Sequence, residues 1–169
     1  WYKMTNILLF WASKGVDGFR CDMAEMVPVE FWEWAIHKVK EQYPSVIFIA
    51  EIYNSQLYHR FIQQGGFDYL YDKVSLYNRL RPLIEGHGNV EDLTWVWQNE
   101  TGTISKHMLR FLENHDEQRI ASTFFAHNPW NALPAMTLCA TMNEGPFMIY
   151  FGQEIGVNAT CSEGFQGDD

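Results

Sequence analysis

Short apolar runs that each end at a carboxylate constrain the fold of this chain most strongly. The runs end at Asp22, Glu51 and Asp116, and they read VDGFRCD, VIFIAE and MLRFLENHD. A segment of helical character follows each run, and strands that alternate with helices indicate βαβ units around a parallel sheet. In a β/α barrel the C-terminal strand ends carry the chemistry. The sequence therefore predicts an α/β fold with these three carboxylates at one rim.

Apolar periodicity and chain-breaking residues predict the positions of the elements. A helix begins near Pro28, and its apolar side chains recur at i, i+3, i+4 and i+7. Gly15 is expected to end the helix before the first strand, and Pro44 is expected to end the helix before the second strand. We expect the end of a helix over about 6–13, further helices over about 28–42, 56–63, 75–84, 90–98 and 134–142, and strands over about 16–22, 46–50, 67–71, 108–113 and 146–151.

Composition excludes some classes of partner. The formal net charge of −9 over 169 residues disfavours nucleic acid, because phosphate binding needs a basic surface, and it suits a neutral ligand such as a sugar. The sequence contains no run of 18 apolar residues, so no membrane span is predicted. The three cysteines are widely spaced, so neither a disulfide framework nor a zinc site is indicated.

The ends of the chain predict that it is a piece of a longer protein. It begins at Trp1 without an initiator methionine and stops at Asp169 in a Gly-rich polar stretch. The sequence consequently gives no indication of localisation.

The first run pairs a cation with its terminal carboxylate. Side chains alternate along a strand, so Gly18, Arg20 and Asp22 face the same side. A neighbouring cation keeps a carboxylate ionised and oriented, as a carboxylate nucleophile requires. A structural ion pair at a strand end explains the same pattern.

Glu51 follows four apolar residues. Removal from water favours the protonated form of a carboxyl group, which suits a general acid at neutral pH. The alternative is a glutamate at the first solvent-exposed position after a strand.

The third run ends in Asn114, His115 and Asp116. Their polar groups can bind sugar hydroxyls, and a carboxylate there can stabilise an oxocarbenium-like transition state, so glycoside cleavage is the chemistry that these runs indicate first. A helix cap is the alternative, because Asn and Asp are strong N-cap residues.

Together these segments resemble signature regions of the α-amylase family of glycoside hydrolases. The resemblance covers nearly the whole chain, in order and spacing. The matching residues are Gly18, Arg20 and Asp22; Glu51; Phe111, Asn114, His115 and Asp116; and Gly145, Pro146, Tyr150, Gly152 and Glu154.

The resemblance implies a fold and roles for the matching residues. Residues 1–169 correspond to about strands 4–8 of a (β/α)8 barrel, without the N-terminal strands, the inserted calcium-binding domain and the C-terminal β-domain. By resemblance Asp22 is the nucleophile, Glu51 the acid/base and Asp116 the transition-state stabiliser of a retaining enzyme that acts on α-glucans such as starch and maltooligosaccharides. Arg20 orients Asp22, and His115 binds the sugar.

One departure from the family concerns the acceptor side of the site. Many α-amylases carry Lys-His at the third and fourth positions after the nucleophile, where this chain has Glu25 and Met26. We still place both among the substrate-binding candidates, with Tyr53 as the best residue to stack on a sugar. No metal ligand is assigned in this chain, although the family implies a possible calcium ion in the full-length protein.

Three functions stay open at this point. A hydrolase of the α-amylase type is the simplest, a glucan- or maltosyltransferase uses the same carboxylates, and a catalytically dead binding or structural relative is the third. The three intact carboxylates argue against the last. A barrel avoids free edges only by closing on itself, so we expect the 169-residue chain alone to be inactive.

Overall fold

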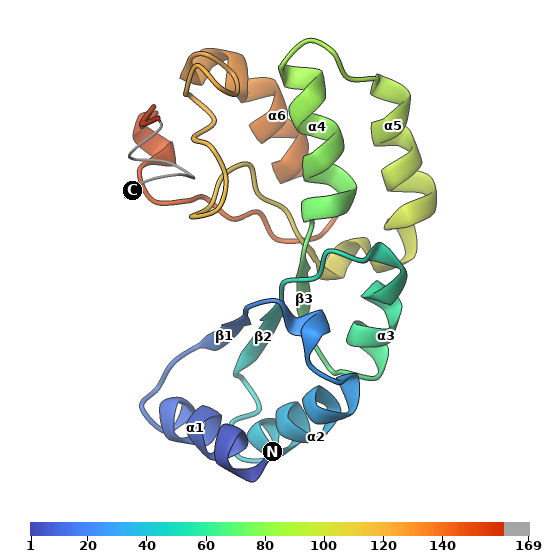
Figure 1. Cartoon of the computed structure of the whole chain (residues 1–169), viewed down its shortest axis with the longest axis vertical. Coiled ribbons are helices and arrows are strands. Elements are labelled where there is room, and N and C mark those ends of the chain that lie inside the picture. Colours follow the sequence, from blue (N-terminus) through green and yellow to red (C-terminus); the bar gives the residue numbers. More distant parts are fainter. Residues whose placement is uncertain (161–169) are drawn as a thin grey trace. The chain divides into compact units, whose positions relative to one another are not determined.

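The protein is described here by a computed structural model over residues 1–160 (Figure 1). Its chain forms two compact units, Trp1–Tyr71 and Asp72–Asp169. Each unit is built from strands and helices that follow one another along the sequence.

The first unit contains three parallel strands, β1 (Gly18–Cys21), β2 (Ile47–Ala50) and β3 (Tyr69–Tyr71), in that order. Cys21 is paired with Ala50, so the residues that follow these strands emerge at the same edge of the sheet. The amide of Glu51 donates to the carbonyl of Cys21 at 3.0 Å and continues the ladder beyond β2.

Helices α1 (Tyr2–Ala12) and α2 (Val29–Lys40) pack against each other (Figure 1). The α2 residues predicted to share one apolar face are all buried: Trp32, Ala35, Ile36 and Val39. The unit is completed by 3-10 turns η1 (Ala24–Met26) and η2 (Ser55–Leu57) and by α3 (Tyr58–Gln63). Apolar periodicity therefore predicted the buried face of α2 correctly.

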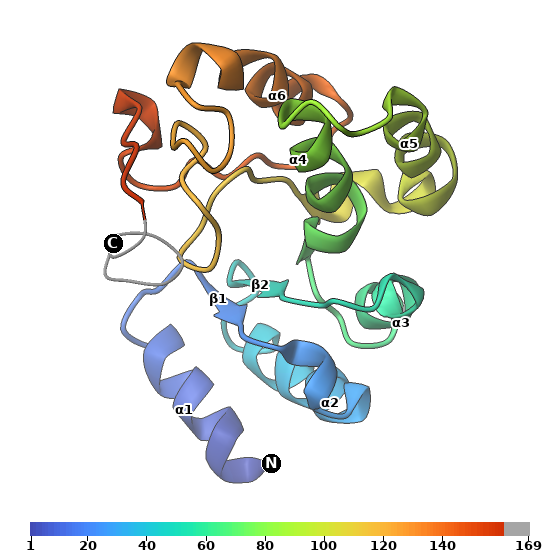
Figure 2. The ribbon, with the colours of Figure 1, turned by 45° about the horizontal axis from the view of Figure 1, so that its top comes forward.

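The second unit is mainly helical. Helix α4 (Asn78–Ile84) packs against α5 (Val90–Trp95) and α6 (Pro129–Thr141) (Figure 2). The remaining elements are η3 (Lys73–Tyr77) and η4 (Val96–Glu100), both π-helical, the 3-10 segments η5 (Gly102–His107) and η6 (Gln153–Ile155), and strand β4 (Met108–Leu109).

The prediction of a last strand over 146–151 is wrong. Only Phe147 bridges to a neighbour, Arg110, in parallel orientation. The chain then turns, because the Tyr150 amide donates to the Gln153 side chain at 3.0 Å instead of to a strand. The strand expected over 108–113 is likewise reduced to β4 and this bridge.

One helix begins earlier than expected, and another ends where the sequence predicts. Helix α6 begins at Pro129 rather than at residue 134, because the Asn128 side chain accepts a hydrogen bond from the Asn131 amide and caps the helix. Helix α1, Tyr2–Ala12, ends before Gly15 as predicted, and the φ of Gly15, +87°, is the left-handed conformation that glycine adopts freely.

Candidate active site

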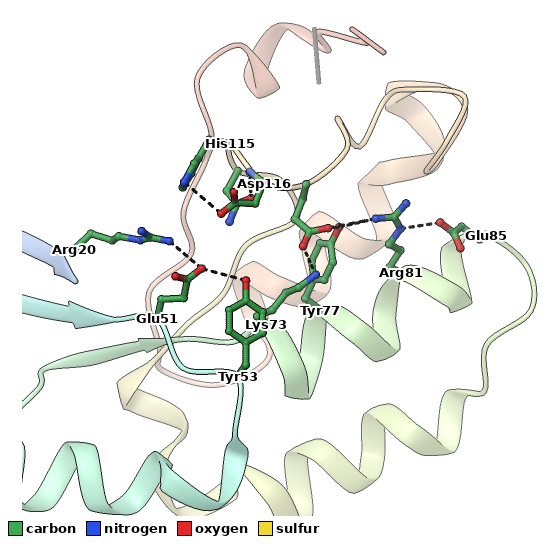
Figure 3. A network of polar contacts seen from close by, with 11 residues as sticks. Arg20, Glu51, Tyr53, Lys73, Tyr77, Arg81, Glu85, His115 and Asp116 are labelled. Carbon is green, nitrogen blue, oxygen red and sulfur yellow. Dashed lines mark hydrogen bonds and ion pairs between the residues drawn. The ribbon is translucent and has the colours of Figure 1, made fainter. Parts of the chain in front are cut away.

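Arg20 contacts both carboxylates at the C-terminal edge of the first sheet. Its Nη1 atom is hydrogen-bonded to Asp22. Its Nη2 atom lies 2.9 Å from Glu51 Oε1 (Figure 3). Burial alone would lower the pKa of the Arg20 guanidinium, but the hydrogen bond to Asp22 and the charge of Glu51 outweigh burial and raise this pKa. The guanidinium therefore stays a cation between the two acids. The alternation of side chains along β1 had predicted that Arg20 and Asp22 face the same side.

The two carboxylates differ in their access to solvent. The Asp22 side chain is 74% exposed and the Glu51 side chain is 5% exposed. The interpretation of Glu51 as a solvent-exposed residue after a strand is therefore wrong. Its Oε1 atom accepts a hydrogen bond from the Tyr53 hydroxyl at 3.2 Å, and its Oε2 atom accepts one from the Met23 amide at 2.9 Å. A buried carboxylate with these donors is held in one orientation.

The backbone after Asp22 supplies part of this cradle. Met23 adopts left-handed dihedral angles, φ 41° and ψ 46°, which are uncommon for a residue with a side chain. Its amide reaches the carboxylate of Glu51, and the next amide, of Ala24, donates to the Glu51 carbonyl at 2.9 Å. These contacts could not be predicted from the sequence, because a backbone donor leaves no signal in the residue type.

The two residues at the divergent positions have different surroundings. Glu25 accepts a hydrogen bond from the Asn54 amide at 3.0 Å and so ties η1 to the loop that follows Glu51. Met26 is 76% exposed. Their assignment to substrate binding, like that of Tyr53, stays a prediction.

Asp116 lies in a turn of the second unit. Its amide donates to Asn114 Oδ1 at 2.8 Å, and its Oδ2 atom lies 3.3 Å from His115 Nε2 (Figure 3). The next α-helix along the chain, α6, begins only at Pro129, so the helix-cap interpretation of this segment is wrong. Asn114 instead closes a local turn through its side chain, as Asx residues often do. Convergence of Asp116 with the other two carboxylates stays a prediction.

Glu117 forms a polar cluster that the sequence analysis did not find. Its carboxylate is ion-paired with Lys73 and accepts a hydrogen bond from the Tyr77 hydroxyl at 2.8 Å. Arg81 Nη1 lies 3.3 Å from the same carboxylate, and Arg81 Nε donates to Glu85 at 2.8 Å. The cation partners of Glu117 come from η3 and α4, far away in sequence, so no local pattern indicates the cluster.

Residues 1–160 contain no group of three or more His, Cys, Asp or Glu side chains that could hold a metal ion. No helix in this part of the chain is long and apolar enough to cross a membrane.

The chain is similar to known proteins in both sequence and structure. Residues 2–168 match the family model of the α-amylase catalytic domain. The alpha-1,4-glucan:maltose-1-phosphate maltosyltransferase of Cereibacter sphaeroides is 35% identical over 85 residues, which are 50% of this chain and 14% of that protein. An α-amylase from Lactobacillus plantarum superposes with a TM-score of 0.72 and 28% identity, over 91% of this chain and 38% of that one.

A third relative supports the fold. The cyclic alpha-maltosyl-(1→6)-maltose hydrolase of Arthrobacter globiformis superposes with a TM-score of 0.85 and 21% identity, over 98% of this chain and 38% of that one. This chain thus spans well under half the length of these relatives. The fold class predicted from the sequence, part of a (β/α)8 barrel, is confirmed. Since the family model matches nearly every residue, the chain belongs to the α-amylase family.

Proposed function

We propose that this chain supplies about strands 4–8 of the catalytic barrel of a retaining enzyme that acts on α-glucans. Asp22 is the nucleophile, Glu51 the general acid/base and Asp116 the transition-state stabiliser. The observation that carries this proposal is the position of Arg20, whose two terminal nitrogens contact Asp22 and Glu51 at one sheet edge. The two carboxyl groups of a retaining glycosidase are separated by about 5–5.5 Å, and one guanidinium shared between two carboxylates suits such a short separation.

In the first step the ionised Asp22 attacks the anomeric carbon. A bond forms between the Asp22 carboxylate and that carbon, and the bond to the glycosidic oxygen breaks. Glu51 gives its proton to the leaving oxygen. The unequal exposure of the two side chains fits these roles, because the nucleophile reaches outward to the sugar and the acid sits in a drier environment.

In the second step Glu51 acts as a base. It takes a proton from water or from an acceptor hydroxyl, whose oxygen then forms a bond to the anomeric carbon and releases Asp22. The contacts of Glu51 with Arg20, Met23 and Tyr53 hold its carboxylate in one orientation, as a base in this step requires.

Transfer of a maltosyl group is a second candidate reaction. It is favoured by the curated relatives, which include the maltosyltransferase that is 35% identical over half of this chain. Hydrolysis and transfer share the glycosyl-enzyme and differ in whether water or a sugar hydroxyl attacks it. The same three carboxylates therefore serve either reaction.

The test uses the protein made from the complete reading frame that contains this chain. Asp22→Asn should abolish turnover of maltooligosaccharides, and Glu51→Gln should lower kcat about 10²–10⁴-fold, as loss of general acid–base catalysis does. Asp17→Asn, an exposed acid before β1, is the matched control and should leave the rate unchanged. Normal turnover by Asp22→Asn would refute the assignment.

A substrate with an activated leaving group separates the two roles. Fluoride leaves with little help from an acid, so Glu51→Ala should still react with α-maltosyl fluoride and accumulate a maltosyl group on Asp22, which mass spectrometry can locate. Incubation of the wild-type protein with maltose 1-phosphate and a glucan acceptor then decides between the two reactions. Phosphate release with chain growth identifies transfer, and free maltose identifies hydrolysis.

A further inference from the structure

We propose that Glu117 is a positioning residue that holds the turn carrying Asp116 in its catalytic geometry. The proposal rests on the role assigned to Asp116 above. Glu117 is adjacent to Asp116 in the chain, and its side chain is only 11% exposed. It points to side chains of η3 and α4 and not to solvent, so it can act on the reaction only through its neighbour.

Three donors converge on the Glu117 carboxylate. Oε1 is ion-paired with Lys73, and Oε2 accepts from the Tyr77 hydroxyl at 2.8 Å and faces Arg81 Nη1 at 3.3 Å. A carboxylate buried to this degree is costly without partners, and removal of its charge partners is more costly still. The number of contacts therefore fixes the backbone at residue 117.

Tyr77 connects this anchor to the apolar core. Its ring stacks on Phe111 with centroids 5.2 Å apart and an interplanar angle of 12°, and it meets Phe125 edge-on at 6.0 Å. The Lys73 ammonium lies 4.2 Å from the centroid of the same ring. Burial, with the charge of Glu117 adding to it, raises the pKa of the Tyr77 hydroxyl, so this group remains a hydrogen-bond donor.

Arg81 carries the network outward. It is held between Glu117 and Glu85 (Figure 3). Its Nη2 atom donates to the Phe124 carbonyl at 3.3 Å. Two cations, Lys73 and Arg81, thus balance two carboxylates. Such a balanced network holds its members in place without leaving a buried charge uncompensated.

The Asp116 residue is consequently fixed from both sides. Asn114 binds its amide on one side, and Glu117 anchors the following residue on the other, while the Asp116 side chain itself stays partly exposed. A displacement of about 1 Å at a reacting group can cost roughly 10²-fold in rate. An anchor of this kind therefore affects the transition state more than the binding of the ground-state sugar.

The experiment compares variants of the cluster in the complete protein. Glu117→Ala should lower kcat about 10–100-fold while KM changes by less than about twofold, because transition-state stabilisation is lost and substrate binding is not. Glu117→Gln keeps one of the two acceptor oxygens and should recover part of kcat. Tyr77→Phe keeps the stacked ring and removes one donor, so its kcat should fall by less than about 10-fold.

A second acid in the same unit provides the control. Glu100 is 18% exposed and lies 3.2 Å from Arg79, in an ion pair that does not include the Asp116 turn. Glu100→Gln should lower the thermal unfolding temperature by a few degrees, as we also expect of Glu117→Gln, and should leave kcat unchanged. If Glu117→Ala does not fold, Glu117→Gln and Tyr77→Phe decide the matter.

An inhibitor with positive charge at the reacting centre gives a readout that a purely structural role would not change. Its affinity should fall in parallel with kcat across the Glu117 and Tyr77 variants, while the affinity of a neutral maltooligosaccharide stays constant. Unchanged kcat in folded Glu117→Ala and Glu117→Gln would overturn the proposal. Activity that persists in Asp22→Asn would instead refute the proposed function, so the two failures are distinguishable.

Discussion

The Nη2 atom of Arg20 lies 2.9 Å from the Oε1 atom of Glu51, while the other terminal nitrogen of Arg20 contacts Asp22. A planar guanidinium with several fixed donors can serve two acids at once, which a single ammonium cannot do in the same way. The effect of replacing Arg20 should therefore depend on the shape of the cation as well as on its charge.

Arg20→Lys should lower kcat/KM by about 10²-fold in the complete protein, although the positive charge is kept. The lysine ammonium is a point charge and cannot bridge both carboxylates, so the orientation of Asp22 or of Glu51 is lost. Steady-state kinetics on maltooligosaccharides measure this effect. Wild-type rates in Arg20→Lys would mean that only the charge matters.

Tyr53 offers a test between two roles. Its hydroxyl donates to Glu51, and its ring is partly exposed. Tyr53→Phe should lower kcat by about 3–10-fold at nearly constant KM if the hydroxyl positions Glu51, since one hydrogen bond is worth roughly 1 kcal/mol. If Phe retains full activity and Tyr53→Ala raises KM instead, the ring is a sugar platform.

Glu25 can be tested with one isosteric variant and one variant that removes the side chain beyond Cβ. Its carboxylate accepts from the Asn54 amide, and a glutamine oxygen can accept the same hydrogen bond. Glu25→Gln should therefore keep kcat, whereas Glu25→Ala should release the loop after Glu51 and lower kcat by several-fold, about the value of one hydrogen bond. Equal loss of acceptor affinity in both variants would instead support a direct charge contact with substrate.

Asp72 gives a prediction about pH and stability. The residue is fully buried beside Arg110, whose Nε atom lies 3.8 Å from Asp72 Oδ2, and burial raises the Asp72 pKa to about 6 despite the Leu76 amide and the Arg110 charge. The folded-state pKa is thus above the unfolded value of about 3.9. The native state holds the proton more tightly, so this group's contribution to stability is full below pH ~4 and is lost as pH rises to ~6.

Asp72→Asn, neutral at every pH, isolates this contribution. Relative to the wild type, the variant should gain stability between pH ~4 and ~6, by at most roughly 3 kcal/mol, since one unit of pKa is worth about 1.4 kcal/mol. The unpaired Arg110 shifts the variant by a constant amount over this range and does not change the slope. Thermal unfolding midpoints across pH test this, with exposed Asp92→Asn as the control. Parallel curves for Asp72→Asn and wild type would contradict the prediction.

Local sequence patterns predicted the elements that bear Asp22 and Glu51, because both follow apolar runs whose parallel pairing brings their ends together. They failed for 146–151, where an apolar run has only one bridge to a neighbour and then turns. Apolar character alone does not specify whether a second strand is available for pairing.

The motifs of the candidate site were visible in the sequence, but its supporting contacts were not. Met23 acts through its amide, and Glu117 through side chains 36 to 44 residues away. Neither kind of contact depends on the residue types nearby in the sequence. Both kinds can therefore be identified only in the folded structure.

The cradle of Glu51 has a consequence for engineering. Because the Met23 amide, and not the Met23 side chain, binds this carboxylate, the side chains of Met23 and Met26, both exposed, are free to vary without loss of that hydrogen bond. Glycine or asparagine at position 23 would even suit its left-handed backbone. A combinatorial library at these two positions therefore tests whether they set the acceptor preference, while the backbone contact of Glu51 is kept.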